Sequence, residues 1–270
     1  MRAFLYGMPI GALGGLIGLG GAEFRLPVLT GVFRYSAKQA VPLNLAISLF
    51  TVVAAFVSRA SLTSLQSLLP IVPLLCMLGI GSMLGAHVGS SHVHRLHEMG
   101  MEKLVTALLI FIGVLLIAES FWVFDAHRLF NSSELDLFLG VLFGLGIGLI
   151  SSFLGVAGGE VIIPTLVLVF GVDIKDAGTG SLLVSTAPIL VGMIRYRQQG
   201  RYRSQSDMHI VTLMGIGSVI GAVVVGVLLG IVPEQHLKLF LGLLLIVSAV
   251  KVFLLKTPRT VVLKRDGEAL

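Results

Sequence analysis

Long apolar runs alternate with short polar connections along this chain as far as position 256. The runs cover residues 3–22, 24–33, 38–57, 66–91, 102–122, 137–156, 160–170, 177–194, 208–230 and 239–255. Most of them approach the roughly 20 residues that a helix needs to cross the hydrocarbon core of a bilayer. The pattern predicts an all-α, polytopic integral membrane protein.

Composition excludes a soluble alternative. Only 12% of the 270 residues are charged, 56% are apolar and the mean hydropathy is +1.00, whereas a soluble domain has about 25% charged residues. A soluble fold of this size would leave much of that apolar surface in water. We interpret the net charge of +5 as basic loops on the cytoplasmic face of a membrane rather than as a nucleic-acid-binding surface.

The second half of the chain repeats the first. Shifted by 137 positions, residues 5–48 align with residues 142–185 without a gap, and 15 of the 44 pairs are identical. Shared Leu or Val is expected by chance in apolar sequence, but shared Glu, Pro and Lys in register is not. The identical pairs include Gly18/Gly155, Gly21/Gly158, Glu23/Glu160, Pro27/Pro164 and Lys38/Lys175. Duplication of this kind is typical of transporters.

The two halves are predicted to cross the membrane in opposite directions, because each holds an odd number of apolar segments. The bias of Lys and Arg toward the cytoplasm agrees: four arginines lie in 195–203, but Arg59 alone lies in the matching connection at 58–66. Tyr196 is interpreted as an aromatic anchor at the membrane interface. The predicted division is a first membrane repeat at 1–124, a linker at 125–136, a second, inverted membrane repeat at 137–256 and a polar cytoplasmic tail at 257–270.

Each half opens with a hairpin that is too short for two full membrane spans. Residues 3–33 are predicted to begin and end in the cytoplasm, and residues 137–170 to begin and end outside. Two spans need roughly 40 residues, so each hairpin is predicted to be broken or re-entrant, with its turn in a glycine cluster, at 18–21 and 155–159. We expect the two tips to meet near the membrane midplane.

The glycine clusters are candidate binding elements. Unwound backbone at membrane depth is tolerated only inside protein or along a wet cavity, and glycine lets a ligand approach the backbone closely. Pro27 and Pro164 are predicted to lie in the first turn of a short helix, whose N–H groups and positive end would suit an anion. The candidate residues are Gly20, Gly21, Gly158 and Gly159. The alternative is that the glycines only allow close helix packing.

Glu23 and Glu160 are the strongest candidates for chemistry. A carboxylate within a membrane segment is expensive and indicates function, here as a proton carrier or a polar ligand to substrate. The alternative is that each Glu only caps the helix that follows it. Arg25 has no counterpart in the second half, where Ile162 takes its place, and is predicted either to neutralise Glu23 or to attract an anionic substrate.

Small polar residues follow each hairpin at helical spacing. Asn44 and Ser48 in the first half align with Ser181 and Ser185 in the second. Their amide and hydroxyl groups suit an oxyanion, and the alternative is hydrogen bonding between helices.

No enzyme or cofactor motif stands out. The chain has no nucleophile elbow, phosphate-binding P-loop or HExxH motif, and its single cysteine excludes an internal disulfide. The Cys and His spacing does not resemble a structural zinc site. We expect no catalysis, no cofactor and no metal.

These features resemble the sulfite exporter TauE/SafE family of membrane transporters. The resemblance rests on two glycine clusters, each leading to a proline and then to a small-polar helix near Lys-x-Ala, at Lys38 and Lys175. It covers essentially the whole chain. It implies an inner-membrane permease with inverted repeats for sulfite, sulfonates or sulfoacetate. Carried over by position, the binding site would fall on Gly20, Gly21, Glu23, Gly158, Gly159 and Glu160.

The expected function is secondary transport of a small anion by alternating access between the two tips, with Glu23 or Glu160 coupling to protons. The alternatives are a small-anion channel of the same architecture and a transporter of non-sulfur organic anions. We expect a multi-pass protein of the cytoplasmic (inner) membrane with both termini in the cytoplasm. Its expected partners are a small anion and lipid, without nucleic acid, and homodimerisation stays open.

Overall fold

The computed structural model describes residues 1–62, 65–92, 133–202 and 204–226, with isolated positions between 103 and 120 and between 236 and 247. Every regular element in these ranges is helical, which confirms the predicted all-α class. Within the predicted apolar segments 102–122 and 239–255 only isolated positions are described, and most of the linker and the whole C-terminal tail lie outside the described residues.

The α-helices of the two halves correspond in order. The first half contains α1 (Arg2–Ile17), α2 (Ala22–Gly31), α3 (Ala37–Leu62), the 3-10 helix η1 (Leu65–Ile71) and α4 (Val72–His92). The second half contains α6 (Ser133–Leu154), α7 (Gly159–Pro164), the π-helix η3 (Thr165–Val169), α8 (Ile174–Gln198) and α9 (Gln205–Gly226). In the repeat register α1 matches α6, α2 matches α7, α3 matches α8 and α4 matches α9.

Five of the described helices are long and apolar enough to cross a membrane. They are Lys38–Ser61, Gln66–Ser91, Glu134–Ser152, Lys175–Gln198 and Gln205–Val225. The chain is therefore a multi-pass membrane protein. α6 starts earlier than the predicted 137, because acidic residues at 134 and 136 occupy its first turn, where the helix dipole favours negative charge.

The second arm of each hairpin is short, as predicted. α2 has 10 residues and rises about 15 Å, half of the roughly 30 Å hydrocarbon core. α7 has 6 residues and passes directly into the five-residue π-helix η3. Neither arm is long enough to span a bilayer.

The prolines lie deeper in these arms than predicted. α2 and α7 each begin directly after a left-handed glycine, Gly21 (φ 69°) and Gly158 (φ 85°). Pro27 and Pro164 are consequently the sixth residues of their helices, and the prediction that they lie in the first turn is wrong. The glycine completes the turn at once, so the helix starts before the glutamate. Proline then cannot donate to the carbonyl four residues earlier, which is that of the glutamate.

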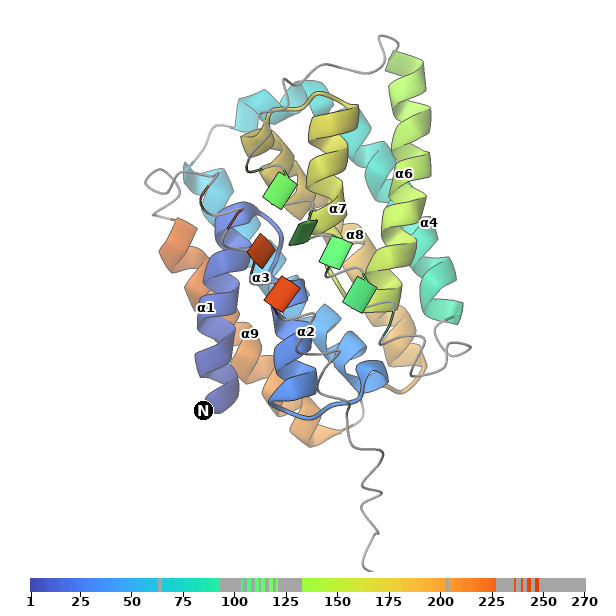
Figure 1. The fold of residues 1–270 in the computed structure, drawn as a ribbon. Helices are drawn as coiled ribbons and strands as arrows, with labels where there is room; N and C mark the ends of the chain where they lie inside the picture. Colours follow the sequence, from blue (N-terminus) through green and yellow to red (C-terminus); the bar gives the residue numbers. More distant parts are fainter. Residues whose placement is uncertain are drawn as a thin grey trace, which may run out of the picture.

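The helices pack in matched pairs. α1 packs against α9 on one flank, α4 packs against α6 on the other, and α2 and α7 lie between the flanks (Figure 1). In the repeat register, the α1–α9 pair corresponds to the α6–α4 pair, and the α3–α9 pair corresponds to the α8–α4 pair. α3 and α8 also contact each other.

Glycines hold the flanking pairs at close range. A Cβ added at Gly7 or Gly11 of α1 would collide with α9 backbone, and a Cβ at Gly144 or Gly148 of α6 would collide with α4 backbone. The contacts follow the repeat register: Gly7 with Met214 and Gly144 with Leu78, then Gly11 with Ser218 and Gly148 with Ser82. These glycines allow close helix packing. The tip glycines Gly18 and Gly155 likewise lie against backbone, that of Gly178 and Val41, so the alternative role in close packing applies to the tips as well.

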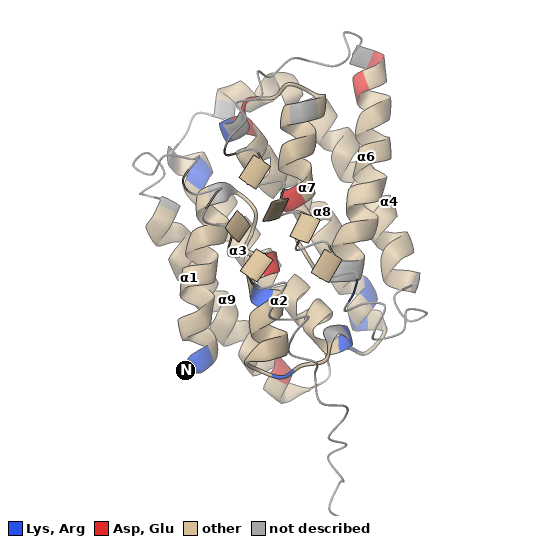
Figure 2. Ribbon diagram, in the orientation of Figure 1, with Lys and Arg blue, Asp and Glu red and all other residues tan. Residues whose placement is uncertain are grey.

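The outer surface is apolar and the charges lie mostly at helix ends. Exposed large apolar side chains on α4, α6 and α9 include Ile80, Leu84, Phe138, Leu142, Ile216 and Val224, as expected for a surface that faces lipid. Figure 2 shows the exceptions to this charge distribution, which are acidic and basic positions around the starts of α2 and α7 in the middle of the bundle.

Candidate functional site

The two hairpin tips contact each other, as the sequence predicts. A Cβ added at Gly159 would lie 3.1 Å from the Cα of Leu19 and 3.2 Å from the carbonyl oxygen of Gly18. A Cβ added at Gly20 would lie 3.3 Å from the Cβ of Ala157. The tip residues are buried, so this contact is part of the protein interior.

The turns at the tips require glycine. Gly18 and Gly155 end α1 and α6 in the left-handed region, with φ of 91° and 63°. In the first tip the N–H groups of Gly18, Leu19 and Gly20 all point at the carbonyl oxygen of Gly14, at 3.0, 3.0 and 3.3 Å. This compact C-terminal cap reverses the chain within a few residues and delivers Glu23 to the centre of the molecule.

The long helix that follows each hairpin, α3 or α8, donates a hydrogen bond to the tip of the other half. Asn44 Nδ2 of α3 donates to the carbonyl oxygen of Gly155 at 2.8 Å, and Ser181 Oγ of α8 donates to that of Gly18 at 2.7 Å. Asn44 Nδ2 also donates to the carbonyl oxygen of Ala22 in its own half at 2.8 Å. Asn44 and Ser181 occupy matching positions, so the two bonds are one interaction repeated. The structure uses these donors for hydrogen bonds between helices.

Arg25 is fully buried in α2 and connects the first tip to α3 and α9. All five of its N–H groups donate to uncharged oxygens. Nε donates to Asn44 Oδ1 (3.1 Å), Nη1 to Thr51 Oγ1 (2.6 Å) and Ser218 Oγ (3.4 Å), and Nη2 to the Gly20 carbonyl oxygen (2.9 Å) and Ser48 Oγ (2.7 Å). Its positive charge is therefore hydrogen-bonded, but no described residue neutralises it by an ion pair in contact.

Glu23 and Glu160 bring two carboxyl groups together across the two tips. Their side chains are 0% and 2% exposed, and each carboxyl group lies within hydrogen-bonding reach of the other and within electrostatic range of Arg25. Among the described residues, no N–H or O–H of another residue makes a hydrogen bond with any of the four oxygens, and each carboxyl group interacts with the backbone N–H of its own glutamate. The cap positions of α2 and α7 are Gly21 and Gly158, and no side chain makes a capping hydrogen bond there, so the alternative that the glutamates only cap these helices is wrong.

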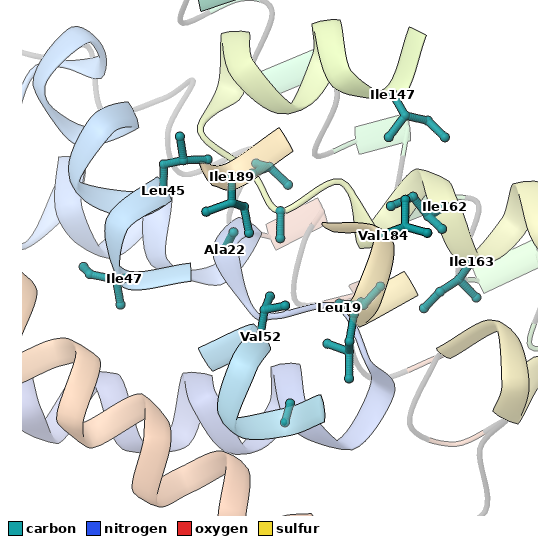
Figure 3. Close-up of a cluster of buried hydrophobic side chains, with 14 of the residues drawn as sticks. Leu19, Ala22, Leu45, Ile47, Val52, Ile147, Ile162, Ile163, Val184 and Ile189 are labelled. Carbon is teal, nitrogen blue, oxygen red and sulfur yellow. The ribbon is translucent and has the colours of Figure 1, made fainter. Parts of the chain in front are cut away.

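Apolar side chains pack beside the polar groups of the tips. Leu19 of the first tip and Ile162 of α7 belong to one buried cluster with Val52 of α3 and Val184 of α8 (Figure 3). Every one of these side chains is at most 3% exposed. The carboxyl pair is buried beside this cluster, and electrostatic interactions are strong in a low-dielectric protein interior.

The second half lacks the arginine, and this leaves a hydroxyl group unused. Ser48 Oγ donates to the Asn44 carbonyl oxygen at 2.8 Å and accepts from Arg25. The matching Ser185 is 1% exposed, but its Oγ has no partner in the part of the chain that the structure describes. The isoleucine at the position of Arg25 cannot donate to it.

Two further side chains support the tips, and the sequence did not single them out for this role. Tyr196, expected at the membrane interface, is 1% exposed and donates to the carbonyl oxygen of Ser152 at 2.8 Å. At the matching position in α3, Arg59 Nη2 donates to the carbonyl oxygen of Leu16 at 2.8 Å. Each satisfies the C-terminal end of the helix that leads into its own tip. Arg59 and Tyr196 align with each other in the repeat, and this alignment could have indicated a shared role at the tips.

A cluster of three or more metal-ligating side chains does not occur in the described ranges. The buried polar groups at the tips are two carboxyl groups, one guanidinium group, hydroxyl groups and an amide.

Comparison with known proteins identifies the family of this chain. Residues 1–116 and 139–268 match the family described as "Sulfite exporter TauE/SafE". The chain is similar to the "Probable membrane transporter protein YdhB" of Bacillus subtilis, with 25% identity over 231 residues that cover 85% of this chain and 90% of the relative. It is also similar to the "Probable membrane transporter protein MJ0441" of Methanocaldococcus jannaschii, with 26% identity over 200 residues, 71% of this chain and 70% of the relative. No solved structure matches. The chain belongs to the sulfite exporter TauE/SafE family of membrane transporters.

Proposed function

We propose that this protein is a secondary transporter for a small sulfur-containing oxyanion such as sulfite, a sulfonate or sulfoacetate. The anion would bind between the two hairpin tips and cross the cytoplasmic membrane by alternating access. The observation that carries the proposal is Arg25, a completely buried cation that has no ion-pair partner in contact among the described residues, at the meeting point of the two hairpin tips. A buried charge of this kind within a membrane protein indicates a substrate or ion pathway.

The tips offer several groups to an oxyanion. The guanidinium group of Arg25 attracts it, and Ser48 Oγ, whose O–H now donates to the Asn44 carbonyl oxygen, can rotate to donate to the anion instead. Ser185 Oγ is free to donate within the described structure. Backbone at Gly20, Gly21, Gly158 and Gly159 allows a ligand to come close, because these residues have no Cβ. The start of α2 adds the positive end of a helix dipole.

The matched packing of the halves supports alternating access. Two structurally equivalent flanks, α1 with α9 and α6 with α4, meet around the tips, and in transporters with inverted repeats one repeat moves against the other around a central site. We place both termini in the cytoplasm from the loop charges.

Cysteine labelling tests this orientation. With Cys76, the only cysteine of the chain, replaced by serine, single cysteines at Gln199 and Asp173 report opposite sides. An impermeant thiol reagent applied to intact cells should label Asp173→Cys and spare Gln199→Cys. Labelling of Gln199→Cys from outside would contradict the proposed orientation.

Counterflow tests the transport mechanism. Purified protein in proteoliposomes preloaded with unlabelled sulfite should take up labelled sulfite transiently and with saturation, and methanesulfonate should compete. A channel of the same architecture would give neither saturation nor counterflow. Competition by acetate or lactate but not by sulfonates would favour non-sulfur organic anions. Absence of flux above that of protein-free liposomes for all of these anions would contradict the proposed function.

The driving force differs between the two directions. An inside-negative potential favours exit of an anion by about 2.3 kcal/mol per charge per 100 mV, so export needs no coupling ion. Uptake against this potential requires one, and the buried glutamates are the candidates to carry it.

A further inference from the structure

We propose that Glu23 and Glu160 share one proton in the unloaded transporter and take up a second proton when the anion binds, so that one proton travels with each singly charged anion. The proposal rests on the proposed transport function and adds to it a stoichiometry and a division of labour between the two acids.

The charges at the tips set the starting point. Glu23 and Glu160 carry the acidic groups and Arg25 the basic one, and all three are at most 2% exposed. The helices packed against the tips contribute uncharged groups there, from Asn44 and Ser48 of α3 and Ser185 of α8. The other buried ionisable side chains of these helices, Arg59 of α3 and Tyr196 of α8, bond to the ends of α1 and α6 instead.

Two ionised carboxylates do not fit this place. They would face each other at hydrogen-bonding range, without a donor from any other described residue, and like charges at such range disfavour double ionisation. The charge of Arg25 balances only one of them. One proton between the two carboxyl groups solves both problems: the O–H of one acid donates to the oxygen of the other, and the three side chains sum to zero charge.

Anion binding then requires a second proton. An anion brings one more negative charge into the buried interior of the protein, where an uncompensated charge is costly. Protonation of the remaining carboxylate restores neutrality, and it frees a carboxyl O–H to donate to the anion. The loaded site holds the anion, the Arg25 cation and two neutral acids, which again sum to zero.

The charge balance predicts different outcomes for single and double variants. With one acid replaced by Gln, Arg25 balances the remaining carboxylate without any proton, and the anion still brings one proton with it. With both acids replaced, the unloaded site holds the Arg25 charge alone and the anion neutralises it directly. Each single variant should therefore keep a ratio of one proton per anion, whereas Glu23→Gln/Glu160→Gln should carry the anion alone.

Proteoliposomes with methanesulfonate provide the test, because this anion keeps one fixed charge and carries no proton of its own. In the wild type, a pH gradient of one unit, acidic outside, should drive about tenfold accumulation inside, and a potential of 100 mV should leave this ratio unchanged. Both single variants should give the same tenfold ratio, at whatever rate they run. In the double variant the pH gradient should have no effect, and an inside-negative potential of 100 mV should lower accumulation about 50-fold.

The outcomes separate this proposal from the transport function itself. Saturable methanesulfonate counterflow with accumulation that follows the potential and ignores pH in the wild type would overturn the coupling and leave the transporter intact. Loss of pH-driven accumulation in only one of the single variants would assign the proton to that acid alone and overturn the sharing. Absence of counterflow for both sulfite and methanesulfonate would instead contradict the proposed function. The wild type and single variants decide the matter even if the double variant does not fold.

Discussion

The two hairpins share one backbone design but differ in the side chains that they carry. Both turn at a left-handed glycine, Gly18 or Gly155, and start the second arm directly after another. Both place a buried glutamate in the first turn of that arm. The first hairpin then adds Arg25 with five hydrogen bonds, whereas the second has an isoleucine there and leaves Ser185 Oγ without a partner.

The features that both hairpins share form a structural frame, whereas the side chains that differ are the candidates for function. The glycines, the cross-half bonds to the tips and the flanking helix pairs recur in both halves, because both tips must be held in the same way. A positive charge does not need to recur, since one anion needs one counter-charge. A symmetric frame with an asymmetric charge therefore favours a single anion site between the tips over two equivalent sites.

The largest effect on stability is expected from substitution of the matching glycines Gly18 and Gly155, which both hairpins share. Gly18→Ala and Gly155→Ala each place a Cβ on a left-handed residue, which costs about 1–2 kcal/mol, and push it into the backbone of Gly178 or Val41, which costs about 1–3 kcal/mol more. Both variants should lower the Tm in detergent by about 5–15 °C. Gly31→Ala is the control, because nothing lies within 4 Å of its added Cβ. An equal loss in Gly31→Ala would contradict the role of the tips.

A smaller effect should distinguish the two cross-half hydrogen bonds. Asn44 donates to two carbonyl oxygens and accepts from Arg25, so Asn44→Ala should destabilise by about 2–4 kcal/mol, since each buried group left unpaired costs about 1–3 kcal/mol. Ser181→Ala breaks the one bond from α8 to Gly18 and should cost about 1 kcal/mol. Thermal unfolding of both variants measures the difference. Equal losses would show that the added bonds of Asn44 contribute nothing.

The smallest effect concerns a contact between the halves away from the tips. Tyr35 OH, in the connection between α2 and α3, donates to Asp207 Oδ1 at 2.8 Å. Burial and this bond raise the pKa of Tyr35. The hydrogen bond therefore contributes fully to stability at pH values below about 10, the pKa of tyrosine in the unfolded chain, and this contribution is lost as the pH rises further. Tyr35→Phe should cost about 1 kcal/mol at pH 7 and lose less Tm than the wild type between pH 9 and 11. A parallel decline in both proteins would contradict this.

The sequence predicted the parts of this structure that depend on local patterns. The apolar runs located the helices, and the alignment of the chain with itself at an offset of 137 positions located the matching halves. The short length of the apolar segments 24–33 and 160–170 predicted the short second arms. The glycine clusters located the tips and the buried glutamates. These predictions worked because a membrane imposes helix length, and because the duplication preserved residues whose backbone geometry has no substitute.

Other features depended on contacts that one chain position does not reveal. The left-handed Gly21 and Gly158 start the helices earlier than the prolines suggested, because turn geometry outweighed the preference of proline for a first turn. Tyr196 next to two arginines had the composition of an interfacial anchor, yet its ring faces inward to reach a free carbonyl of α6. The acceptors of Arg25 come from α2's own tip, α3 and α9, which only the folded chain brings together.

The most direct test of an anion site at the tips is thermal stabilisation by sulfite of the purified wild type, Arg25→Gln and Ile162→Leu. Sulfite at 100 times its Kd should stabilise a binding-competent protein by about 2.7 kcal/mol, which corresponds to a rise in Tm of about 5–10 °C. We expect this rise in the wild type and in Ile162→Leu, the volume-conserving change at the matching position. We expect none in Arg25→Gln, whose own unfolding transition reports that it is folded. An equal rise in Arg25→Gln would place the anion elsewhere and contradict the account.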